Sequence, residues 1–380
     1  IGASNVSYKG KGITFIDTPG HAAFTNMRAR GANATDLVVL VVAATEGFKP
    51  QTVEAMNQAL AAKVPIIVAI NKIDLPDADP DKVLLHGLTS ENWGGTVGTV
   101  PVSAKTGQGL PDLLERILME AEMLELKANP KRAAQGIVLE AQLENGLGPT
   151  ASVLIQDGTL HVGDVVLCGE SYGKIRTLIN DKNERVKSAG PSTPVKIVGL
   201  SGVPDAGDPL EIFESEKAAR AEAANRVAEK RGHMLATSSI ATAEDLFSKL
   251  NSEDRNTLNI IIKSDVRGSG EAITQSLAQL PSEKIKAEVI SCAVGPISEN
   301  DISLAAATNS LVVGFHVRVN PGVNDMAKKQ NVEIRLYSII YELLEDITDA
   351  LAGKLEPEKR EKPIGTAKIL QVIELSKGPK

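Results

Sequence analysis

The chain has 380 residues, of which 42% are hydrophobic and 23% are charged, and its formal net charge is −7 at pH 7. This length accommodates about two to four domains of ordinary soluble composition, and the sequence contains neither an apolar run of about 18 residues nor a secretory leader. The negative charge gives no sign of a general nucleic-acid-binding surface, and the only cysteines, Cys168 and Cys292, favour a reducing cytoplasm over a disulfide framework or a metal site.

Strands and helices alternate over the first third of the chain. Apolar, β-branched runs predict strands, and apolar residues three or four apart predict helices, the first of which begins after Pro50. The alternation predicts a parallel sheet with right-handed crossovers. The run "DLVVLVVAA" is apolar throughout, which indicates a strand covered on both faces. The expected strands lie at 12–17, 36–44, 64–71 and within 96–104, and the expected helices at 51–63 and 109–126.

The pattern changes near "KANPKRAA". Short β-rich runs follow, separated by turn residues such as "DGTL" and "NDKN", and this spacing predicts a small β-barrel or sandwich. The charged, alanine-rich run at 214–231 indicates a solvated helix or linker. The expected strands lie at 136–143, 150–156, 164–169, 173–179, 194–200 and 209–213.

From about residue 252 the alternation of strands and helices returns and predicts a second, smaller α/β domain. In "SDVRGSGEAI" the glycines indicate a turn from strand to helix with Ser269 as the helix cap, and Ile273 stands where a dinucleotide-binding motif needs Gly or Ala. One further strand is expected at 364–375. The other expected strands lie at 257–264, 285–294, 310–317 and 331–337, and the expected helices at 270–280, 298–308 and 338–353.

Three short motifs each follow a buried strand, where open parallel sheets bind their ligands. The first is Asp17-Thr18-Pro19-Gly20-His21. Asp17 can hold a hydrated Mg²⁺, and Gly20 allows its backbone N–H to approach a phosphate. A plain Pro-Gly turn has the same pattern, so this motif alone leaves both interpretations open.

The second motif is Asn71-Lys72-Ile73-Asp74, and the third is Ser103-Ala104-Lys105. A carboxylate such as Asp74 accepts hydrogen bonds only, so it suits the paired donors of guanine. Lys72 can cover the base with its aliphatic stem, and Asn71 can brace neighbouring loops. A backbone N–H of the third motif can meet the guanine carbonyl while Lys105 flanks the ring. Each motif alone is weak, but the conjunction favours a guanine-nucleotide site.

The order DTPGH, NKID, SAK is similar to that of translational GTPases. The stretches "FIDTPGHAAFTNMRARGANATDLVVLVVAATEGFKPQT" and "ENWGG" resemble the bacterial translation initiation factor 2 family, and the likeness extends from residue 1 to about 375 through "GTLHVGDVVLCG" and "LVVGFHVRV". It implies an α/β multidomain fold. Its parts are a P-loop GTPase-like parallel-sheet domain lacking its P-loop and switch I at 1–127, a β-barrel at 131–214, a helical linker at 215–251, an α/β/α domain at 252–353, and a linker with the first strand of a truncated C-terminal tRNA-binding barrel at 354–380.

The chain departs from this family in one respect. No Gly-x-x-x-x-Gly-Lys-[Ser/Thr] motif, which cradles phosphates in P-loop GTPases, occurs in it. In the family that loop precedes "IGA", so the sequence is expected to start after switch I. The parent protein is expected to be a GTPase that converts GTP to GDP and phosphate, and the chain as given is expected to be inactive.

The resemblance also implies roles for residues and partners. The family delivers formyl-methionyl initiator tRNA to the 30S ribosomal subunit through its C-terminal barrel and promotes joining of the 50S subunit. Its members are expected to act in the cytoplasm as monomers that contact ribosomal RNA and do not bind a membrane.

Arg28 and Arg30, on the switch II helix, are expected to be solvated. Two alternatives remain: a non-catalytic ribosome-binding short form, and another, elongation-type translational GTPase. By the resemblance, His21 positions the attacking water, Asp17 serves Mg²⁺ through water, Gly20 meets the γ-phosphate, and Asn71, Lys72, Asp74, Ser103, Ala104 and Lys105 read guanine.

Overall fold

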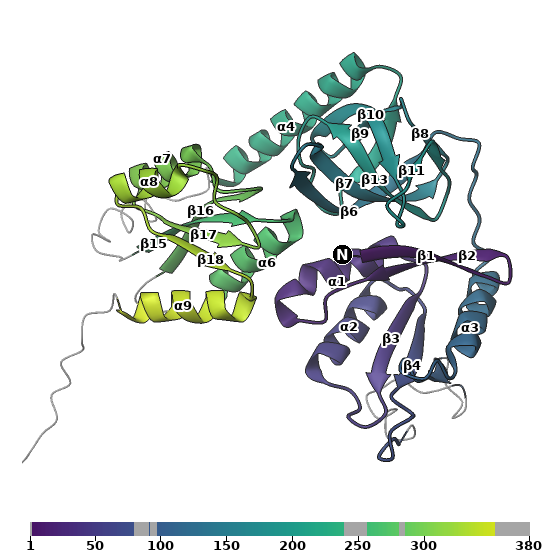
Figure 1. The fold of residues 1–380 in the computed structure, drawn as a ribbon. Helices are drawn as coiled ribbons and strands as arrows, with labels where there is room; N and C mark the ends of the chain where they lie inside the picture. The colour runs from purple at the N-terminus through teal and green to yellow at the C-terminus, as the bar shows by residue number, and fades with distance from the viewer. Residues whose placement is uncertain (1, 80–90, 92–96, 239–256, 281–285, 354–380) are drawn as a thin grey trace, which may run out of the picture.

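The computed structural model describes residues 2–79, 91, 97–238, 257–280 and 286–353. They form an N-terminal α/β part, a β-barrel and a second α/β part, with the barrel above the first part and the second α/β part beside both (Figure 1). In the described part of the chain, no helix is long and apolar enough to cross a lipid bilayer. The strand expected at 364–375 lies outside the described residues.

The N-terminal part contains a three-stranded parallel sheet in the order β3-β4-β5. Val38 pairs with Ile66 and Ile67 pairs with Gly98, so all three strands run in one direction, as the alternation predicts. Proline stands at the start of both α2 and α3. The elements are β3 (Val38–Ala43), β4 (Ile66–Asn71), β5 (Gly98–Pro101), η1 (Ala22–Phe24), α1 (Thr25–Ala34), α2 (Pro50–Ala61) and α3 (Leu110–Met123).

The strand that ends in the DTPGH motif does not pair with this sheet. It is β2 (Lys11–Asp17), which forms an antiparallel hairpin with β1 (Gly2–Tyr8), a strand that the sequence pattern does not reveal. The hairpin lies between the barrel and the parallel sheet (Figure 1). The expectation that β3 is covered on both faces is also wrong at Val41, which is 59% exposed. Val39 on the same face packs against the core that contains residues of α3, but Val41 belongs to none of the hydrophobic cores of the described residues.

The middle part is a closed antiparallel barrel, which decides between the barrel and the sandwich that the sequence allowed. Six strands follow one another in the order β10-β13-β7-β6-β14-β9, and β9 pairs with β10 to close the ring. Cys168 is fully buried in its core. The strands are β6 (Gln135–Glu144), β7 (Gly148–Asp157), β9 (Val165–Cys168), β10 (Ser171–Ile179), β13 (Thr193–Leu200) and β14 (Pro209–Phe213), with the short β8 (Leu160–His161), β11 (Arg185–Val186) and β12 (Ser188–Ala189) at the side.

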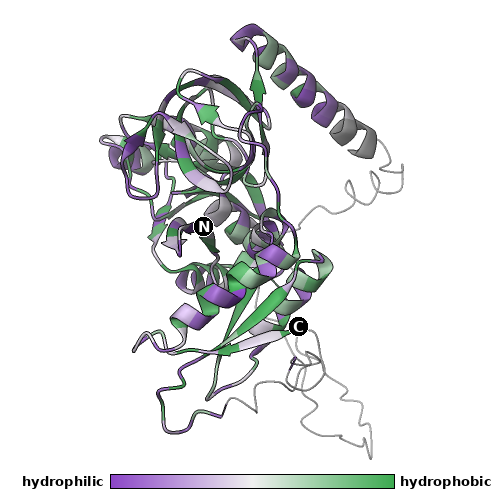
Figure 2. Ribbon diagram, turned by 90° about the vertical axis from the view of Figure 1, so that its right-hand side faces the viewer, coloured by the Kyte–Doolittle hydropathy of each residue, from purple (hydrophilic) through white to green (hydrophobic). Residues whose placement is uncertain are grey.

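The charged run after the barrel forms a long helix, α4 (Glu216–Ser238). Hydrophilic residues run along it in Figure 2, but its first turns are not simply solvated. Ala219 and Ala223 are buried. Arg226 donates to the carboxylate of Glu211 on β14 at 2.9 Å, which ties the helix to the barrel. Alanines at four-residue spacing thus give this charged helix a narrow packing face.

The second α/β part has a parallel sheet in the order β16-β15-β17-β18. Along β15, Ile260 and Ile262 face a core shared with α6 and α9, whereas Ile261 faces a core shared with α7 and α8. Helices therefore cover both faces. The elements are β15 (Thr257–Ser264), α6 (Arg267–Ala278), β16 (Lys286–Val294), α7 (Glu299–Thr308), β17 (Leu311–Phe315), α8 (Val323–Lys329), β18 (Ile334–Tyr337) and α9 (Ile340–Gly353).

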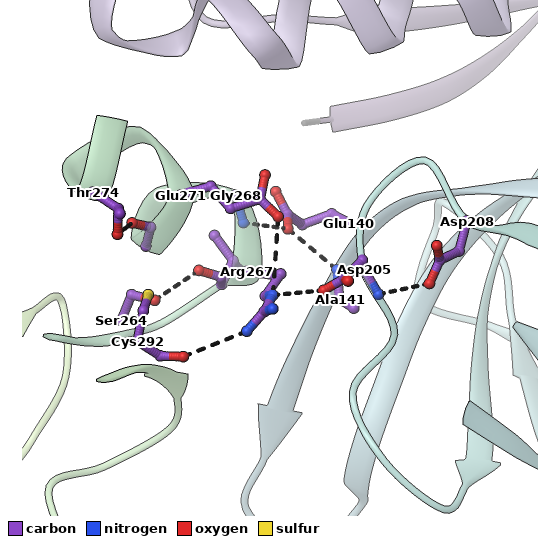
Figure 3. Close-up of polar contacts among 12 residues, drawn as sticks. Glu140, Ala141, Asp205, Asp208, Ser264, Arg267, Gly268, Glu271, Thr274 and Cys292 are labelled. Atoms are coloured by element: carbon purple, nitrogen blue, oxygen red, sulfur yellow. Dashed lines mark hydrogen bonds and ion pairs between the residues drawn. The ribbon is translucent and has the colours of Figure 1, made fainter. Parts of the chain in front are cut away.

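The three parts meet at the start of α6 (Figure 3). The backbone N–H of Gly268 donates to the buried Glu140 of the barrel at 3.1 Å, and Arg267 Nε donates to Asp205 at 2.8 Å. A Cβ added to Gly268 would lie 2.2 Å from Cε of Met27 on α1, so a larger residue there would have to displace the end of the Met27 side chain. The expected cap, Ser269, lies inside the helix, because α6 begins at Arg267 with Val266 as its N-cap residue.

Candidate nucleotide site

The second and third motifs come together at one edge of the parallel sheet, because β4 and β5 are neighbours and both end there. Asn71 is the last residue of β4. Its Oδ1 accepts the backbone N–H of Lys72 at 2.8 Å and that of Ala104 at 3.0 Å. One amide side chain therefore joins the two loops, the bracing that the sequence suggested for Asn71.

The backbone turns sharply directly after this strand. Lys72 has a φ of 67°, a left-handed conformation that is costly for a residue with a Cβ and is often found at functional sites. Its N–H is satisfied by Asn71, which stabilises the turn. Lys72 Nζ lies 3.3 Å from the carboxylate of Glu46, so its side chain extends along the surface.

Asp74 is oriented by the third motif. Ser103 is fully buried, and its hydroxyl donates to Oδ1 of Asp74 at 2.7 Å while accepting the N–H of Thr106 at 3.2 Å. The Asp74 carboxylate is exposed, and an ionised carboxylate has about four acceptor sites, of which the Ser103 hydroxyl takes one. The remaining sites can accept a pair of parallel donors from a ligand.

One detail differs from the expected use of the third motif. The N–H of Ala104 is donated to Asn71, so a guanine carbonyl would have to share or replace that bond. Lys105 is exposed beside it. The hydrogen bond to Asn71 therefore holds the loop of Ala104 in one conformation, and a bound base would have to shift this loop locally to reach the N–H of Ala104.

The first motif lies at the end of the separate hairpin. Asp17 and Gly20 are both exposed. A Cβ added to Gly20 would meet no atom within 4 Å, so packing within the chain does not require glycine there, and the backbone stays open to a ligand. Among the described residues no group of three or more His, Cys, Asp or Glu could hold a metal. A single exposed carboxylate does fit a Mg²⁺ that keeps its waters and takes other ligands from phosphate.

His21 packs against the second α/β part rather than facing the loops of Asn71 and Ser103. Its Nδ1 accepts the N–H of Ala23 at 2.9 Å, which places the proton of a neutral ring on Nε2. The ring centroid lies 4.2 Å from that of Tyr341 on α9, and Nε2 is enclosed with no hydrogen-bond partner among the described residues. Burial lowers the pKa of His21, and the charge of Arg28 lowers it further.

The expectation that Arg28 and Arg30 are solvated is wrong. Arg28 is 6% exposed and forms an ion pair with Glu54 of α2, with 2.7 Å between Nη2 and Oε1. Arg30 forms an ion pair with Glu271 of α6, with 2.5 Å between Nη2 and Oε2. Each arginine finds its partner far along the chain, so helical spacing gave no sign of either pair.

Comparisons with known proteins agree with this architecture. Residues 1–123 match the family described as "Elongation factor Tu GTP binding domain", residues 133–213 match "Elongation factor G domain 2", and residues 233–348 match "Translation-initiation factor 2".

Curated relatives named "Translation initiation factor IF-2" align over 99% of the chain. The protein from Parvibaculum lavamentivorans is 50% identical, with 43% of its own length covered, and that from Bacillus pumilus is 49% identical, with 54% covered. The chain thus spans about half the length of these relatives. Among solved structures, GDP-bound aIF5B from Aeropyrum pernix is 26% identical with a TM-score of 0.53, and the match covers 93% of this chain and 68% of that one.

Proposed function

Because the chain belongs to the translation initiation factor 2 family of translational GTPases, we propose that it is the nucleotide-reading and ribosome-facing region of a bacterial-type initiation factor. The activity is GTP-dependent delivery of formyl-methionyl initiator tRNA to the 30S subunit and promotion of 50S joining. GTP is hydrolysed to GDP and phosphate on the ribosome. The partners are both subunits, their RNA and the initiator tRNA, and the factor acts as a cytoplasmic monomer.

The observation that carries this proposal is the pair of links between the loops after β4 and β5. Asn71 holds Ala104, and Ser103 holds Asp74, so two loops distant in sequence form one preorganised acceptor site. Guanine presents two adjacent donors and adenine does not, so an oriented carboxylate selects guanine. Lys72 and Lys105, both exposed, would flank the base on its two faces. The solved relative described as GDP-bound supports the same ligand class.

The phosphate end would be served by the first motif. Bound GTP with Mg²⁺ supplies a β–γ phosphoanhydride that water can cleave. Asp17 would accept hydrogen bonds from the waters of the metal, and the backbone at Gly20 would approach the γ-phosphate. His21 would orient the attacking water, the role that glutamine has in other GTPases. For this role its Nε2 must leave the contact with Tyr341.

A chimera tests the proposal. The regions of the Bacillus pumilus relative before and after the matched segment are joined to this chain, and we call the product the extended chain. We expect it to bind GTP in preference to ATP and to hydrolyse GTP when ribosomes are present. The 380-residue chain, which has no Gly-x-x-x-x-Gly-Lys-[Ser/Thr] motif, should bind GTP about 10³-fold or more weakly, since each charge-assisted contact contributes roughly 1.5–3 kcal/mol.

Other outcomes favour the alternatives. Ribosome binding by the extended chain without turnover would indicate a non-catalytic binding protein. Preference for elongator or selenocysteyl-tRNA over formyl-methionyl initiator tRNA would indicate an elongation-type factor. Micromolar GTP binding by the 380-residue chain would show that the phosphate contacts outside the three motifs are dispensable.

A further inference from the structure

We propose that Arg28 is a positioning residue for the GTPase reaction, holding the loop from Pro19 to His21 by its two backbone carbonyls while Glu54 anchors the guanidinium. The inference rests on the proposed function, since it assigns a role around His21. It gives a role to a residue that lies outside the three motifs and that the sequence led us to expect as merely solvated.

The contacts of Arg28 run from a helix to the loop. Its Nη1 donates to the carbonyl of Pro19 at 3.0 Å and to that of His21 at 2.6 Å. Its Nη2 donates to Glu54 Oε1 at 2.7 Å. A planar guanidinium presents its donors in a fixed fork, so the positions of carboxylate and carbonyls determine one another.

The anchor is itself fixed. Glu54 Oε1 also accepts the hydroxyl of Thr25 at 2.6 Å and the side-chain amide of Gln58 at 3.1 Å. Glu54 lies on α2, a helix that packs on the β3-β4-β5 sheet through the buried residues Met56 and Ala59. The sheet edge that carries Asn71 and the loop that carries His21 are therefore connected through α2, Glu54 and Arg28.

The hydrogen bonds from Arg28 to the carbonyls of Pro19 and His21 restrain the backbone on either side of Gly20 and at His21 itself. Fixing the carbonyl of His21 fixes the direction in which the chain enters η1, where the ring accepts the N–H of Ala23. A displacement of about 1 Å in a catalytic group can cost 10²-fold in rate. The positive charge of Arg28 also lowers the pKa of His21, after burial, which favours the neutral ring that this role needs.

If Arg28 acted only as the partner of Glu54 in a buried ion pair, the expected behaviour of the variants would be different. If only the pair mattered, exchanging the two charges would restore whatever is lost, because the attraction between positions 28 and 54 would return. If the carbonyl bonds matter, the exchange fails, since glutamate at position 28 has no donor for Pro19 and His21. Arg28→Lys keeps the charge and loses the fork, so it separates the two effects.

The first test uses the 380-residue chain and nuclear magnetic resonance. Histidine signals are assigned with His21→Ala, since the chain has five histidines. In Arg28→Gln we expect the pKa of His21 to rise and the amide of Ala23 to exchange at least 10-fold faster. In Arg28→Lys we expect the pKa to stay low while exchange accelerates. Unchanged exchange at Ala23 in both variants would overturn the proposal.

The second test uses the extended chain, with single-turnover hydrolysis on ribosomes beside equilibrium GTP binding. We expect Arg28→Gln to slow hydrolysis about 10²-fold with GTP affinity kept within a few-fold, and the exchange of Arg28→Glu with Glu54→Arg to leave it slow. Arg30→Gln is the matched control: it breaks the other ion pair of the same helix, with Glu271, and should leave the rate within a few-fold. If Arg28→Gln fails to fold, the hydrolysis rate of Arg28→Lys is measured in its place, and slow hydrolysis is again the expected result.

Two failures can be told apart. If His21→Ala hydrolyses GTP at the unaltered rate, the catalytic assignment in the proposed function is wrong. If His21→Ala is slow and Arg28→Lys and the charge exchange are as fast as the unaltered protein, the proposed function stands and the role given to Arg28 is wrong.

Discussion

The imidazole of His21 stacks on the ring of Tyr341, with 4.2 Å between ring centroids and 38° between ring planes. The contact joins η1, directly after the DTPGH motif, to the first turn of α9. Nε2, the atom that would hold a water under the proposed function, is buried without a hydrogen-bond partner among the described residues. If His21 orients the attacking water as proposed, its ring has to leave this packed position first, and the contact with α9 would then gate the reaction.

Removing the Tyr341 ring should change the titration of His21. Burial lowers the pKa of His21 below its ordinary value of 6.5, followed by the charge of Arg28. In Tyr341→Ala the imidazole of His21 becomes hydrated, so we expect the pKa of His21 to move up toward 6.5. Tyr341→Phe keeps an aromatic ring against the imidazole and should leave the pKa of His21 low. The measurement is the chemical shift of the His21 ring against pH. Equal values in both variants would mean that the stack does not bury His21.

The same shift predicts a pH dependence of stability. Because the folded pKa of His21 is lowered, the unfolded chain binds more protons between that pKa and 6.5. The stability contributed by the neutral ring is thus complete above about pH 6.5 and is lost as the pH falls toward the folded pKa. We expect His21→Gln to flatten this part of the urea-midpoint profile of the 380-residue chain. A profile with undiminished slope would assign the pH dependence to other groups.

Asp74 should determine which base is bound. In the extended chain, Asp74→Asn replaces one acceptor by a donor, which opposes a donor of guanine but suits the extra carbonyl of xanthine. We expect weaker GTP binding and a shift toward xanthosine triphosphate in competition experiments. Asp77→Asn, on the same exposed loop, serves as the control and should bind GTP normally. No shift toward xanthine in Asp74→Asn would remove Asp74 from base recognition.

His21 should matter for chemistry and little for ground-state binding. In the extended chain we expect His21→Ala to slow ribosome-stimulated hydrolysis about 10²–10⁴-fold, the usual contribution of a positioned catalytic group. GTP affinity should stay within a few-fold, since the ring lies against Tyr341. Parallel losses of rate and affinity would mark His21 as a structural residue of the turn.

Gly270 tests the packing beneath α6. A Cβ at this position would lie 2.6 Å from Sγ of Cys292 and 2.9 Å from Oγ of Ser264. Overpacking costs about 1–3 kcal/mol, and the higher helix propensity of alanine offsets about 1 kcal/mol. We expect Gly270→Ala to be less stable by urea unfolding and Cys292→Ala to relieve part of the loss. Gly232→Ala is the control, because that helical glycine has open space around it and should gain stability.

The regular elements could be predicted because their patterns are local. Strand β3 is an uninterrupted apolar run, β4 is apolar up to its last residue, Asn71, and the short β5 contains two β-branched residues. Adjacency of the parallel strands then brings Asn71 to Ala104. Strand β1 was missed because "GASNVSY" consists largely of glycine, alanine, serine and asparagine, which have low β-propensity, and it shows no regular alternation of apolar residues. Helix α8 was missed because it has only seven residues.

The contacts of individual side chains could not be predicted in the same way. Burial of Arg28 depends on Glu54 and on two carbonyls of a neighbouring loop, and stacking of His21 depends on Tyr341 from another part of the chain. Both are tertiary contacts between segments without a shared period, so no pattern along the sequence encodes them. The motifs could be recognised, whereas the groups that restrain them had to be read from the fold.

The buried thiol of Cys168 can be used to detect opening of the barrel. Its thiol is fully enclosed, and burial, with the charge of Asp208, raises its pKa. Since the thiolate is the form that alkylates, an iodoacetamide-type reagent can reach this sulfur only when the barrel opens. The half-buried Cys292 under α6 reports on the second α/β part. The alkylation rates of Cys168 and Cys292, measured by peptide mass mapping in the same unaltered chain, therefore separate local opening of the barrel from local opening of the second α/β part.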